Sequence, residues 1–341
     1  MKFLIFTDNH FCERYSLISR YGSKYSIRLE NQLESINWVE QLAVDEKCDG
    51  VICAGDFFDK ATLTDQELTA LRDIKWNNLP HYFLVGNHES EEGNLQYSST
   101  KALESDSRRV IWEPTVMDLG ASELAFLPYT TESDRKPLNE VFEPMKKPRI
   151  LISHNDICGL HYGPVVTKTG FTIEDLEGNS TLCINGHLHN GQDVTPRIIN
   201  LGNLTGKDLG ENAEIYLHRV IILDTDTLKI DYRENPYAFN FYKLDILEEA
   251  DLEKLTNLKQ NAVVSIKCLD SLVAKAKEII DKNKNIVETR VVTVKPVFSD
   301  GSTEYDLSDL TMDHLARFYE ICKEKIENTD VLDQELAEVL K

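Results

Sequence analysis

The chain has 341 residues, of which 58 are acidic and 37 basic, so that its formal net charge is −21. Its hydrophobic fraction of 41% and charged fraction of 28% exclude the disordered and fibrous classes, and its length predicts a catalytic domain with accessory parts. The acidic balance excludes a generally basic nucleic-acid-binding coat, although a nuclease needs positive charge only along its substrate path and at its metals.

Short β-rich runs alternate with helical patterns through the first two thirds of the chain. Leucine and isoleucine recur at roughly helical spacing between residues 29 and 42, which predicts a helix between the first two strands. Strand–helix–strand alternation with polar residues after each strand is typical of α/β folds, whose sites lie at the carboxyl ends of the strands. The predicted buried strands are 2–7, 50–54, 81–85, 149–153 and 181–185.

The pattern changes at about residue 219. A strand pair at 220–223 and 228–232 is followed by a break at 234–236, where we place a domain boundary. A small α+β unit with strands at 241–246, 262–268 and 289–294 comes next. A linker at 299–302 and two amphipathic helices, at about 308–327 and 330–340, complete the prediction.

The seven cysteines are scattered and contain no CxxC pair, which predicts reduced thiols in a cytoplasmic protein. The six residues that open the sequence meet Asp8, Asn9 and His10 at once, so they predict a buried strand and not a signal peptide. No apolar run approaches the roughly 18 residues needed to span a membrane. We therefore expect no membrane partner.

Five motifs rich in metal-binding side chains follow predicted strands. In an extended segment, the side chains of a D-x-H or H-x-H pair point the same way. One such motif alone is most often a turn residue or a satisfied polar group, whereas five in one order, holding five of the nine histidines, indicate a joint site. The motifs are Asp8-Asn9-His10, Gly55-Asp56-Phe57-Phe58-Asp59, Gly86-Asn87-His88-Glu89, His154 and Gly186-His187-Leu188-His189.

These donors favour particular metals. Imidazole, carboxylate and amide groups together suit Mn²⁺, Fe²⁺ or Zn²⁺ and are too rich in nitrogen for Ca²⁺. We expect two divalent metal ions, Mn²⁺ in first place, with Mg²⁺, Fe²⁺ and Zn²⁺ as alternatives. The motif order D-x-H, GDxxD, GNHE, H and GHLH resembles the calcineurin-like metallophosphoesterases over residues 1–235.

The resemblance implies a fold, a reaction and a role for each motif residue. The fold would be a four-layer α/β/β/α metallophosphoesterase sandwich with a small α+β capping domain and a C-terminal helical tail. The metals would polarise a phosphodiester and activate a water for direct attack. His88 would not bind metal but act as the general acid. Asp8, His10 and His189 would bind one metal, Asn87, His154 and His187 the other, and Asp56 would bridge them.

The second motif distinguishes among members of the family. Protein phosphatases carry GDxVDRG, whereas residues 55–61 lack that arginine and resemble the SbcD-type repair nucleases. The resemblance implies a DNA exonuclease or endonuclease subunit of an SbcCD-type recombination and double-strand-break repair complex. Its predicted parts are a nuclease domain (1–235), a capping domain (236–298) and a tail (299–341) that binds an SbcC-type coiled-coil ATPase. A homodimer would form through residues 65–74 and 95–103.

The small size resembles the recombination nucleases of large tailed phages, which would place the protein in the host cytoplasm. Two alternatives stay open. One is a stand-alone phosphodiesterase or phosphatase for small phosphoesters, with the C-terminal third as a lid; the other is a scaffold with a vestigial site. Asp59, where some relatives have histidine, has no assigned role.

Basic residues interleaved with tyrosines follow the first motif. They could contact DNA phosphates while the tyrosines stack on bases, or they could belong to a solvated loop. The candidate DNA contacts are Arg14, Arg20, Lys24 and Arg28.

Overall fold

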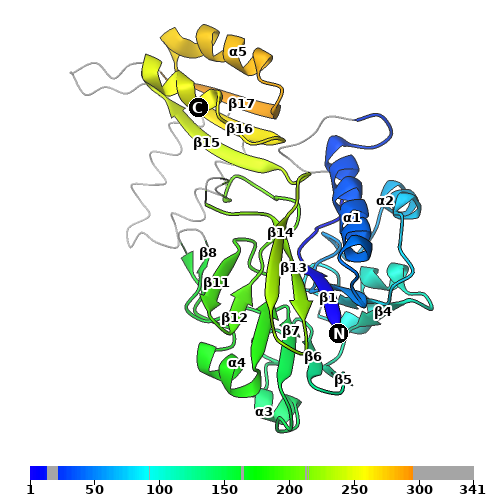
Figure 1. Ribbon diagram of the computed structural model, residues 1–341. Helices are drawn as coiled ribbons and strands as arrows, with labels where there is room; N and C mark the ends of the chain where they lie inside the picture. Colours follow the sequence, from blue (N-terminus) through cyan, green and yellow to red (C-terminus); the bar gives the residue numbers. More distant parts are fainter. Residues whose placement is uncertain (14–21, 92, 163–164, 212, 214, 295–341) are drawn as a thin grey trace, which may run out of the picture.

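The computed structural model describes residues 1–13, 22–91, 93–162, 165–211, 213 and 215–294 (Figure 1). Two six-stranded sheets form its larger part. The first sheet has the order β14-β13-β1-β2-β3-β4. Its strands are β1 (Lys2–Phe6), β2 (Gly50–Cys53), β3 (His81–Leu84), β4 (Arg108–Ile111), β13 (Arg219–Asp224) and β14 (Ile230–Glu234).

The second sheet has the order β11-β12-β10-β7-β6-β5. In each sheet four adjacent strands are parallel: β1 to β4 in the first, and β6, β7, β10 and β12 in the second. The loops that follow parallel strands therefore meet at one edge. The strands are β5 (Thr115–Asp118), β6 (Glu123–Leu127), β7 (Arg149–Ser153), β10 (Leu182–Asn185), β11 (Gln192–Thr195) and β12 (Ile198–Asn200).

Side-chain alternation along β1 explains the layers. Phe3 and Ile5 point into the core between the two sheets, whereas Leu4 and Phe6 point to the outer face, where helix α1 (Ile27–Asp45) packs. Helices α3 (Leu138–Val141) and α4 (Ile173–Asn179) cover the outer face of the second sheet. The predicted four-layer α/β/β/α order is confirmed, and this sandwich buries three apolar interfaces.

Helix α1 begins where the sequence offers a cap. The Ser26 hydroxyl accepts a hydrogen bond from the N–H of Leu29 at 3.1 Å, which satisfies one backbone donor of the first turn. Leu29, Ile36 and Val39 are fully buried against the sheet. The predicted apolar stripe is thus the contact face of the helix.

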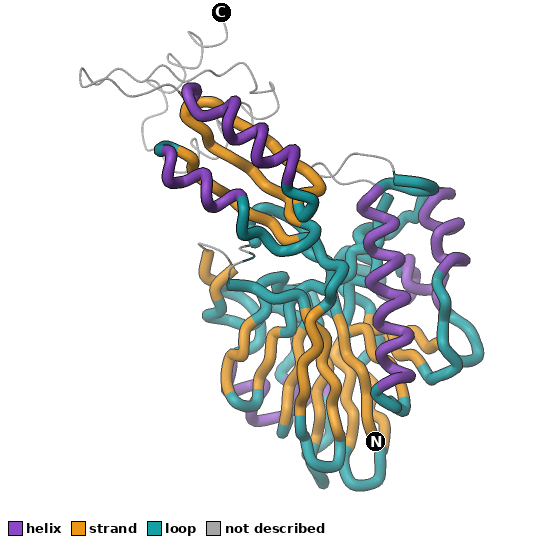
Figure 2. Tube along the Cα trace, turned by 45° about the horizontal axis from the view of Figure 1, so that its top comes forward, coloured by secondary structure: helices purple, strands orange, loops and turns teal. Residues whose placement is uncertain are grey.

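A separate three-stranded parallel sheet follows the sandwich (Figure 2). Helix α5 (Val273–Lys282) and the 3-10 helix η4 (Glu249–Leu255) pack on one face of this sheet around their own core. The element order agrees with the predicted α+β unit, whereas the boundaries at 235 and 298 stay predictions. The predicted tail at 299–341 lies outside the described residues. The strands are β15 (Asn240–Ile246), β16 (Ala262–Leu269) and β17 (Ile286–Val294).

The two segments predicted for a dimer are short helices: α2 (Asp65–Ala70), η1 (Leu71–Asp73), η2 (Leu95–Tyr97) and η3 (Ser99–Leu103). Ile74 and Leu103 are buried in the domain core, while Leu68 is exposed. Most of the apolar stripe therefore faces inward, and the dimer stays a prediction. A two-stranded hairpin, β8 (His161–Tyr162) and β9 (Val165–Val166), completes the described strands. None of the described helices has the length and apolar content to cross a membrane.

Candidate metal centre

The loops after β1 and β2 are joined by backbone hydrogen bonds at the sheet edge. The N–H of Asp8 donates to the carbonyl of Gly55, and that of His10 to the carbonyl of Asp56, both at 3.0 Å. Asp8, His10, Asp56 and His187 have positive φ angles and make up four of the seven such non-glycine residues among those described. Because this conformation costs about 1–3 kcal/mol each, its concentration here marks a functional constraint.

Two motif glycines allow this close approach. A Cβ atom on Gly86 would lie 2.1 Å from Oδ1 of Asp56. At Gly55, which has a φ of 105°, it would lie 2.1 Å from Nδ1 of His154. A side chain at either position would collide with a candidate ligand, so the glycines are needed for the packing of the site.

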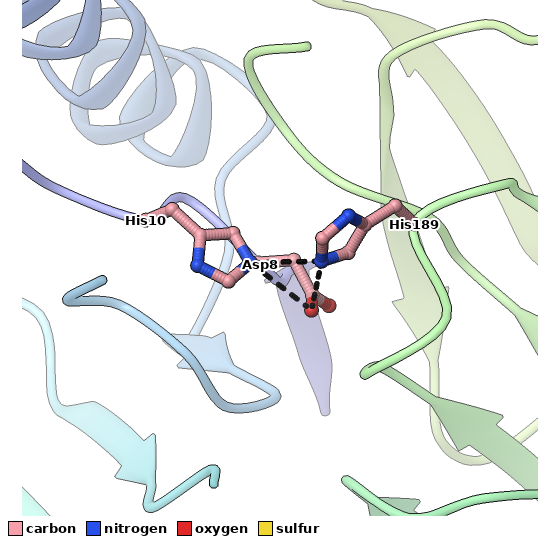
Figure 3. A group of neighbouring side chains, drawn as sticks. All are labelled: Asp8, His10 and His189. Atoms are coloured by element: carbon pink, nitrogen blue, oxygen red, sulfur yellow. Dashed lines mark hydrogen bonds and ion pairs between the residues drawn. The ribbon is translucent and has the colours of Figure 1, made fainter. Parts of the chain in front are cut away.

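Asp8, His10 and His189 form the first cluster (Figure 3). The Nε2 atoms of the two histidines face each other at 3.0 Å, and they lie 3.7 and 3.8 Å from Oδ1 of Asp8. Nδ1 of His10 lies 3.0 Å from Oδ1 of Asp59, an arrangement that holds the proton on Nδ1 and leaves the Nε2 lone pair for the cluster. One cation could take all three donors.

Asp56, His154 and His187 form the second cluster. Nε2 of His154 lies 3.2 Å from Oδ2 of Asp56, while its Nδ1 donates to the carbonyl of Ala54 at 2.7 Å. Nε2 is therefore the ring nitrogen that faces the carboxylate. Nδ1 of His187 lies 2.9 Å from the side-chain oxygen of Asn87, which brings the amide to the same cluster.

Asp56 lies between the clusters. The same Oδ2 atom that faces His154 is 3.9 Å from Nε2 of His10. A carboxylate in this place can bind a cation on either side. The structure therefore brings all seven predicted ligands together, and it also groups His88 with His10 and Asp56, so the division into two ligand sets stays a prediction.

The donors fit two divalent metal ions. Among the described residues, Oδ1 of Asp8 and Nε2 of His154 are buried and have no hydrogen-bond partner, although both point into the site. A buried polar atom without a partner is costly, and a metal ion would satisfy both. Imidazole, carboxylate and amide donors suit first-row divalent ions.

The electrostatics of the site favour positive charge. Burial opposes protonation of His154, but the carboxylates of Asp56 and Asp8 outweigh it and raise the pKa of the imidazole to about 9. Burial likewise opposes ionisation of those two carboxyls, yet the nearby histidines hold the pKa of each below its usual value. The carboxylates are thus ionised at neutral pH, as metal binding requires.

His88 lies beside the first cluster, at the surface of the site. The backbone N–H of His88 donates to Oδ1 of Asp56 at 3.0 Å, and its ring Nδ1 donates to the carbonyl of Asp59 at 2.9 Å. This contact leaves Nε2 for a substrate, and the side chain is 33% exposed, which makes it reachable. Burial lowers the pKa of His88. The position suits the predicted general acid, but the lowered pKa favours the neutral ring, so the imidazolium that could donate from Nε2 would need the negative charge of a bound phosphate.

The family model for calcineurin-like phosphoesterases matches residues 1–224. The chain belongs to this family. A search of curated proteins found no significant match. As a calcineurin-like phosphoesterase, the protein is a metal-dependent hydrolase of phosphoesters.

Similar solved structures include TT1561 of Thermus thermophilus, with 13% identity, 68% of this chain and 98% of that chain covered, and a TM-score of 0.42. A dimetal phosphatase from Danio rerio has 11% identity, covers 69% and 98%, and has a TM-score of 0.37. The Escherichia coli phosphoesterase Yfce has 10% identity, covers 69% and 100%, and has a TM-score of 0.31.

Three further carboxyl groups of this phosphoesterase surround the candidate ligands. Asp59 contacts His10; burial opposes its ionisation, but the interaction with His10 and the nearby charges of Lys207 and His88 together lower its pKa to about 2. Oδ1 of Asp156 lies 3.1 Å from Nε2 of His187. Glu89 accepts hydrogen bonds from the N–H groups of Phe58 and Gly86, and burial, with the Asp56 charge, raises its pKa to about 7. It thereby joins the second and third motifs.

The sequence interpretation missed Asp156 and Lys207 and gave Asp59 no role. Asp156 stands two residues after His154, a spacing that could have drawn attention to it. Lys207 lies in a loop without a motif, and Nζ is 3.5 Å from Nδ1 of His10. No sequence signal connects it to the site, because the contact depends on how the loop folds back.

The candidate DNA contacts are only partly described by the structure. Arg14 and Arg20 lie outside the described residues. Lys24 is exposed and forms an ion pair with Asp73 at 2.6 Å. Arg28 has no exposed surface, and its Nη1 donates to the carbonyl of Gly206 at 2.5 Å. The interpretation of Arg28 as a DNA contact is therefore wrong: it stabilises the loop that carries Lys207.

Proposed function

We propose that this phosphoesterase is a two-metal phosphodiesterase that cleaves DNA. One metal would be held by Asp8, His10 and His189, the other by Asn87, His154 and His187, with Asp56 shared between them. Two divalent ions, Mn²⁺ in first place, would supply Lewis acidity and a nucleophilic water. The grouping of these donors, where the strand ends of the two sheets meet, supports the proposal.

Protonation of the leaving group would depend on a side chain of the protein. His88 would donate a proton to the leaving oxygen from Nε2 as an imidazolium, the form that a bound phosphate would favour, because its Nδ1 proton is already donated to the Asp59 carbonyl. The hydrogen bond from the His88 backbone to Asp56 keeps this imidazole beside the shared carboxylate. The leaving group would thus depart on the side where the site opens.

The observation that carries the choice of DNA is the three-stranded unit beside the site. The N–H of Phe239, just before β15, donates to the carbonyl of Thr205 at 3.0 Å, and Leu209 packs against Phe239 and Phe241. The loop between Thr205 and Leu209 therefore connects this unit to the metal centre. The three-stranded unit would therefore add binding surface next to the metal centre, which a polymeric substrate would need.

The layout also resembles that of an SbcD-type nuclease. We propose that the chain acts in recombination and double-strand-break repair as a homodimer with an SbcC-type ATPase, which would bind residues 299–341. The second motif supports this choice, because it lacks the arginine of the protein phosphatases.

A small phosphoester is the second candidate substrate. The burial of Arg28, the ion pair of Lys24 and the net charge of −21 favour it, since DNA needs a basic path to the metals. In this case the three-stranded unit would be a lid.

A substrate comparison tests the two candidates. The Mn²⁺-loaded protein is assayed on a linear DNA duplex, a single-stranded oligonucleotide and bis(p-nitrophenyl) phosphate, with His154→Ala as the control for a contaminating nuclease. We expect cleavage of all three by the parent and of none by the control. Hydrolysis of the small diester without any DNA cleavage would contradict the nuclease proposal and support the small-phosphoester enzyme.

A further inference from the structure

Lys207 places an ammonium group beside the metal centre. Its Nζ lies 3.5 Å from Nδ1 of His10 and 3.5 Å from Oδ1 of Asp59. The residue is only 9% exposed, so the charge is largely withdrawn from water. Because a buried ammonium costs several kcal/mol unless it is well paired, this position needs an anionic partner.

The pairing that the described residues provide is loose. A charge-assisted hydrogen bond between nitrogen and oxygen spans about 2.7–2.9 Å, and both contacts of Nζ are longer. Oδ1 of Asp59 is also shared with His10, at 3.0 Å. An ammonium group has three donors, so Lys207 keeps capacity for a further anion.

The ammonium lies on the far side of the His10 ring from the candidate metals. Nε2 of His10 faces His189 and Asp8, whereas Nδ1 faces Asp59 and Lys207. An anion held by Nζ would therefore lie one imidazole ring away from the reacting phosphate. It would be a second anionic group of the same substrate.

The loop that carries this cation has a well-held backbone. The backbone N–H of Lys207 donates to both carboxyl oxygens of Glu211, at 2.9 and 3.0 Å. Gly206 has a φ of 71°, and a Cβ atom there would lie 2.2 Å from the carbonyl of Phe239. A cation fixed before binding loses little freedom when the ligand arrives, which favours affinity.

We propose that Lys207 binds a second phosphate of the substrate, next to the phosphate at the metals, and so selects substrates with more than one phosphate. The inference rests on the proposed function, since it assumes that one phosphate is held at the metal centre. The second phosphate could be the neighbouring one in an oligonucleotide or the second one of a nucleotide. A purely structural Lys207 would instead serve as a counter-ion for Asp59.

Binding measured without turnover tests the inference. The metal-loaded parent and the variants Lys207→Met and Lys207→Arg are titrated by calorimetry with thymidine 5′-monophosphate and thymidine 3′,5′-bisphosphate. We expect the parent to bind the bisphosphate more tightly than the monophosphate. Lys207→Met should bind the bisphosphate about tenfold more weakly than the parent does, and its affinity for the monophosphate should be unchanged. Lys207→Arg keeps the charge, so its affinity for the bisphosphate should stay within about threefold of that of the parent.

Metal content is measured on the same samples, which separates binding from a structural role. The inference is wrong if Lys207→Met binds both nucleotides like the parent, weakens both equally, or loses metal. Cleavage of an oligothymidylate by the three proteins then identifies the source of the phosphate. A parallel loss of about tenfold in kcat/KM favours the oligonucleotide. If the parent leaves it intact while the bisphosphate still depends on Lys207, the nuclease proposal fails and the inference holds for a nucleotide.

Discussion

Asp56 and His88 are neighbours in space, joined by a hydrogen bond of 3.0 Å, but they have different expected roles. We expect Asp56→Ala to lose bound metal and activity together, because this carboxylate faces both clusters. His88→Ala should keep its metals and lose about 10²–10⁴-fold in turnover, the usual contribution of a general acid. Metal analysis and steady-state kinetics measure both. A His88→Ala variant that turns over like the parent would exclude the general-acid role.

Asp156 is expected to act through His187. Its carboxylate lies 3.1 Å from Nε2, so it orients the ring with Nδ1 toward Asn87. Carboxylates that hold a ligating histidine typically contribute about 10–100-fold in metal affinity, and we expect a loss of that size in Asp156→Asn. Competition with a fluorescent chelator measures the affinity. Asp193→Asn, in a surface ion pair with Arg219, is the matched control and should bind metal like the parent.

At the scale of the residue, the sequence was most informative where a side chain follows a strand. The seven ligand candidates and His88 could be located because each is next to a predicted strand end. Asp156 and Lys207 could not, since their roles depend on loop paths that no periodicity encodes. Arg28 was misjudged because a charged residue was expected at the surface, whereas it is buried on Gly206.

Helix α1 offers a test of the packing that supports the site. Ile36 is fully buried on the outer face of the first sheet, while Val44 on the same helix is 49% exposed. We expect Ile36→Ala to lower the free energy of unfolding by about 2–5 kcal/mol, through lost burial and a cavity. The free energy of unfolding of Val44→Ala should stay within about 0.5 kcal/mol of that of the parent. Chemical denaturation measures both, and similar losses in the two variants would contradict the orientation of the helix.

The buried polar cluster behind the Lys207 loop gives a pH prediction. His218 Nδ1 donates to the carbonyl of Asn203 at 3.0 Å, and burial lowers the pKa of His218 to about 4. Burial raises the pKa of its neighbour Glu211 to about 7. Nε2 of His218 lies 3.7 Å from Glu211, but both groups are neutral between these values, so the contact is not an ion pair there.

The two residues affect stability in opposite directions. The unfolded chain protonates His218 near pH 6.5 and the folded chain only near 4, so this residue costs stability as the pH falls. The free energy of unfolding of His218→Gln should therefore rise by roughly 2 kcal/mol relative to that of the parent as the pH falls from 7 to 4.5. Glu211 keeps its proton in the folded state up to about pH 7, whereas the unfolded chain loses it at lower pH, so this residue costs stability as the pH rises. The free energy of unfolding of Glu211→Gln should therefore rise relative to that of the parent between pH 4.5 and 7. Urea denaturation across this range measures both, and pH-independent differences would contradict the burial of these groups.

At the scale of the whole molecule, the prediction from sequence was accurate for the order of elements. The parallel strands, helix α1 and the strands at 240–294 follow clear apolar runs, which is why they could be located. How the three-stranded unit contacts the site could not be predicted. That contact depends on the hydrogen bond from Phe239 to Thr205 and on Leu209, which no motif marks.

The C-terminal segment is predicted to dock an ATPase. Residues 300–341 hold 12 acidic and 4 basic residues, a balance that suits a basic protein partner better than DNA. We expect deletion of residues 303–341 to leave metal-dependent cleavage of a short oligonucleotide nearly intact and to abolish binding of an SbcC-type ATPase. Cleavage assays and co-elution measure the two effects. Unchanged affinity of the truncated chain for the ATPase would contradict docking through this segment.

The central claim is that the loops at the strand ends of the two sheets hold two metal ions that act together on a phosphoester. Metal-free protein is titrated with Mn²⁺, and bound metal is followed by calorimetry while hydrolysis of bis(p-nitrophenyl) phosphate is measured at each step. The account predicts two ions per chain and full activity only when both sites are filled. Saturation at one ion per chain with full activity, or hydrolysis without bound metal, would contradict it.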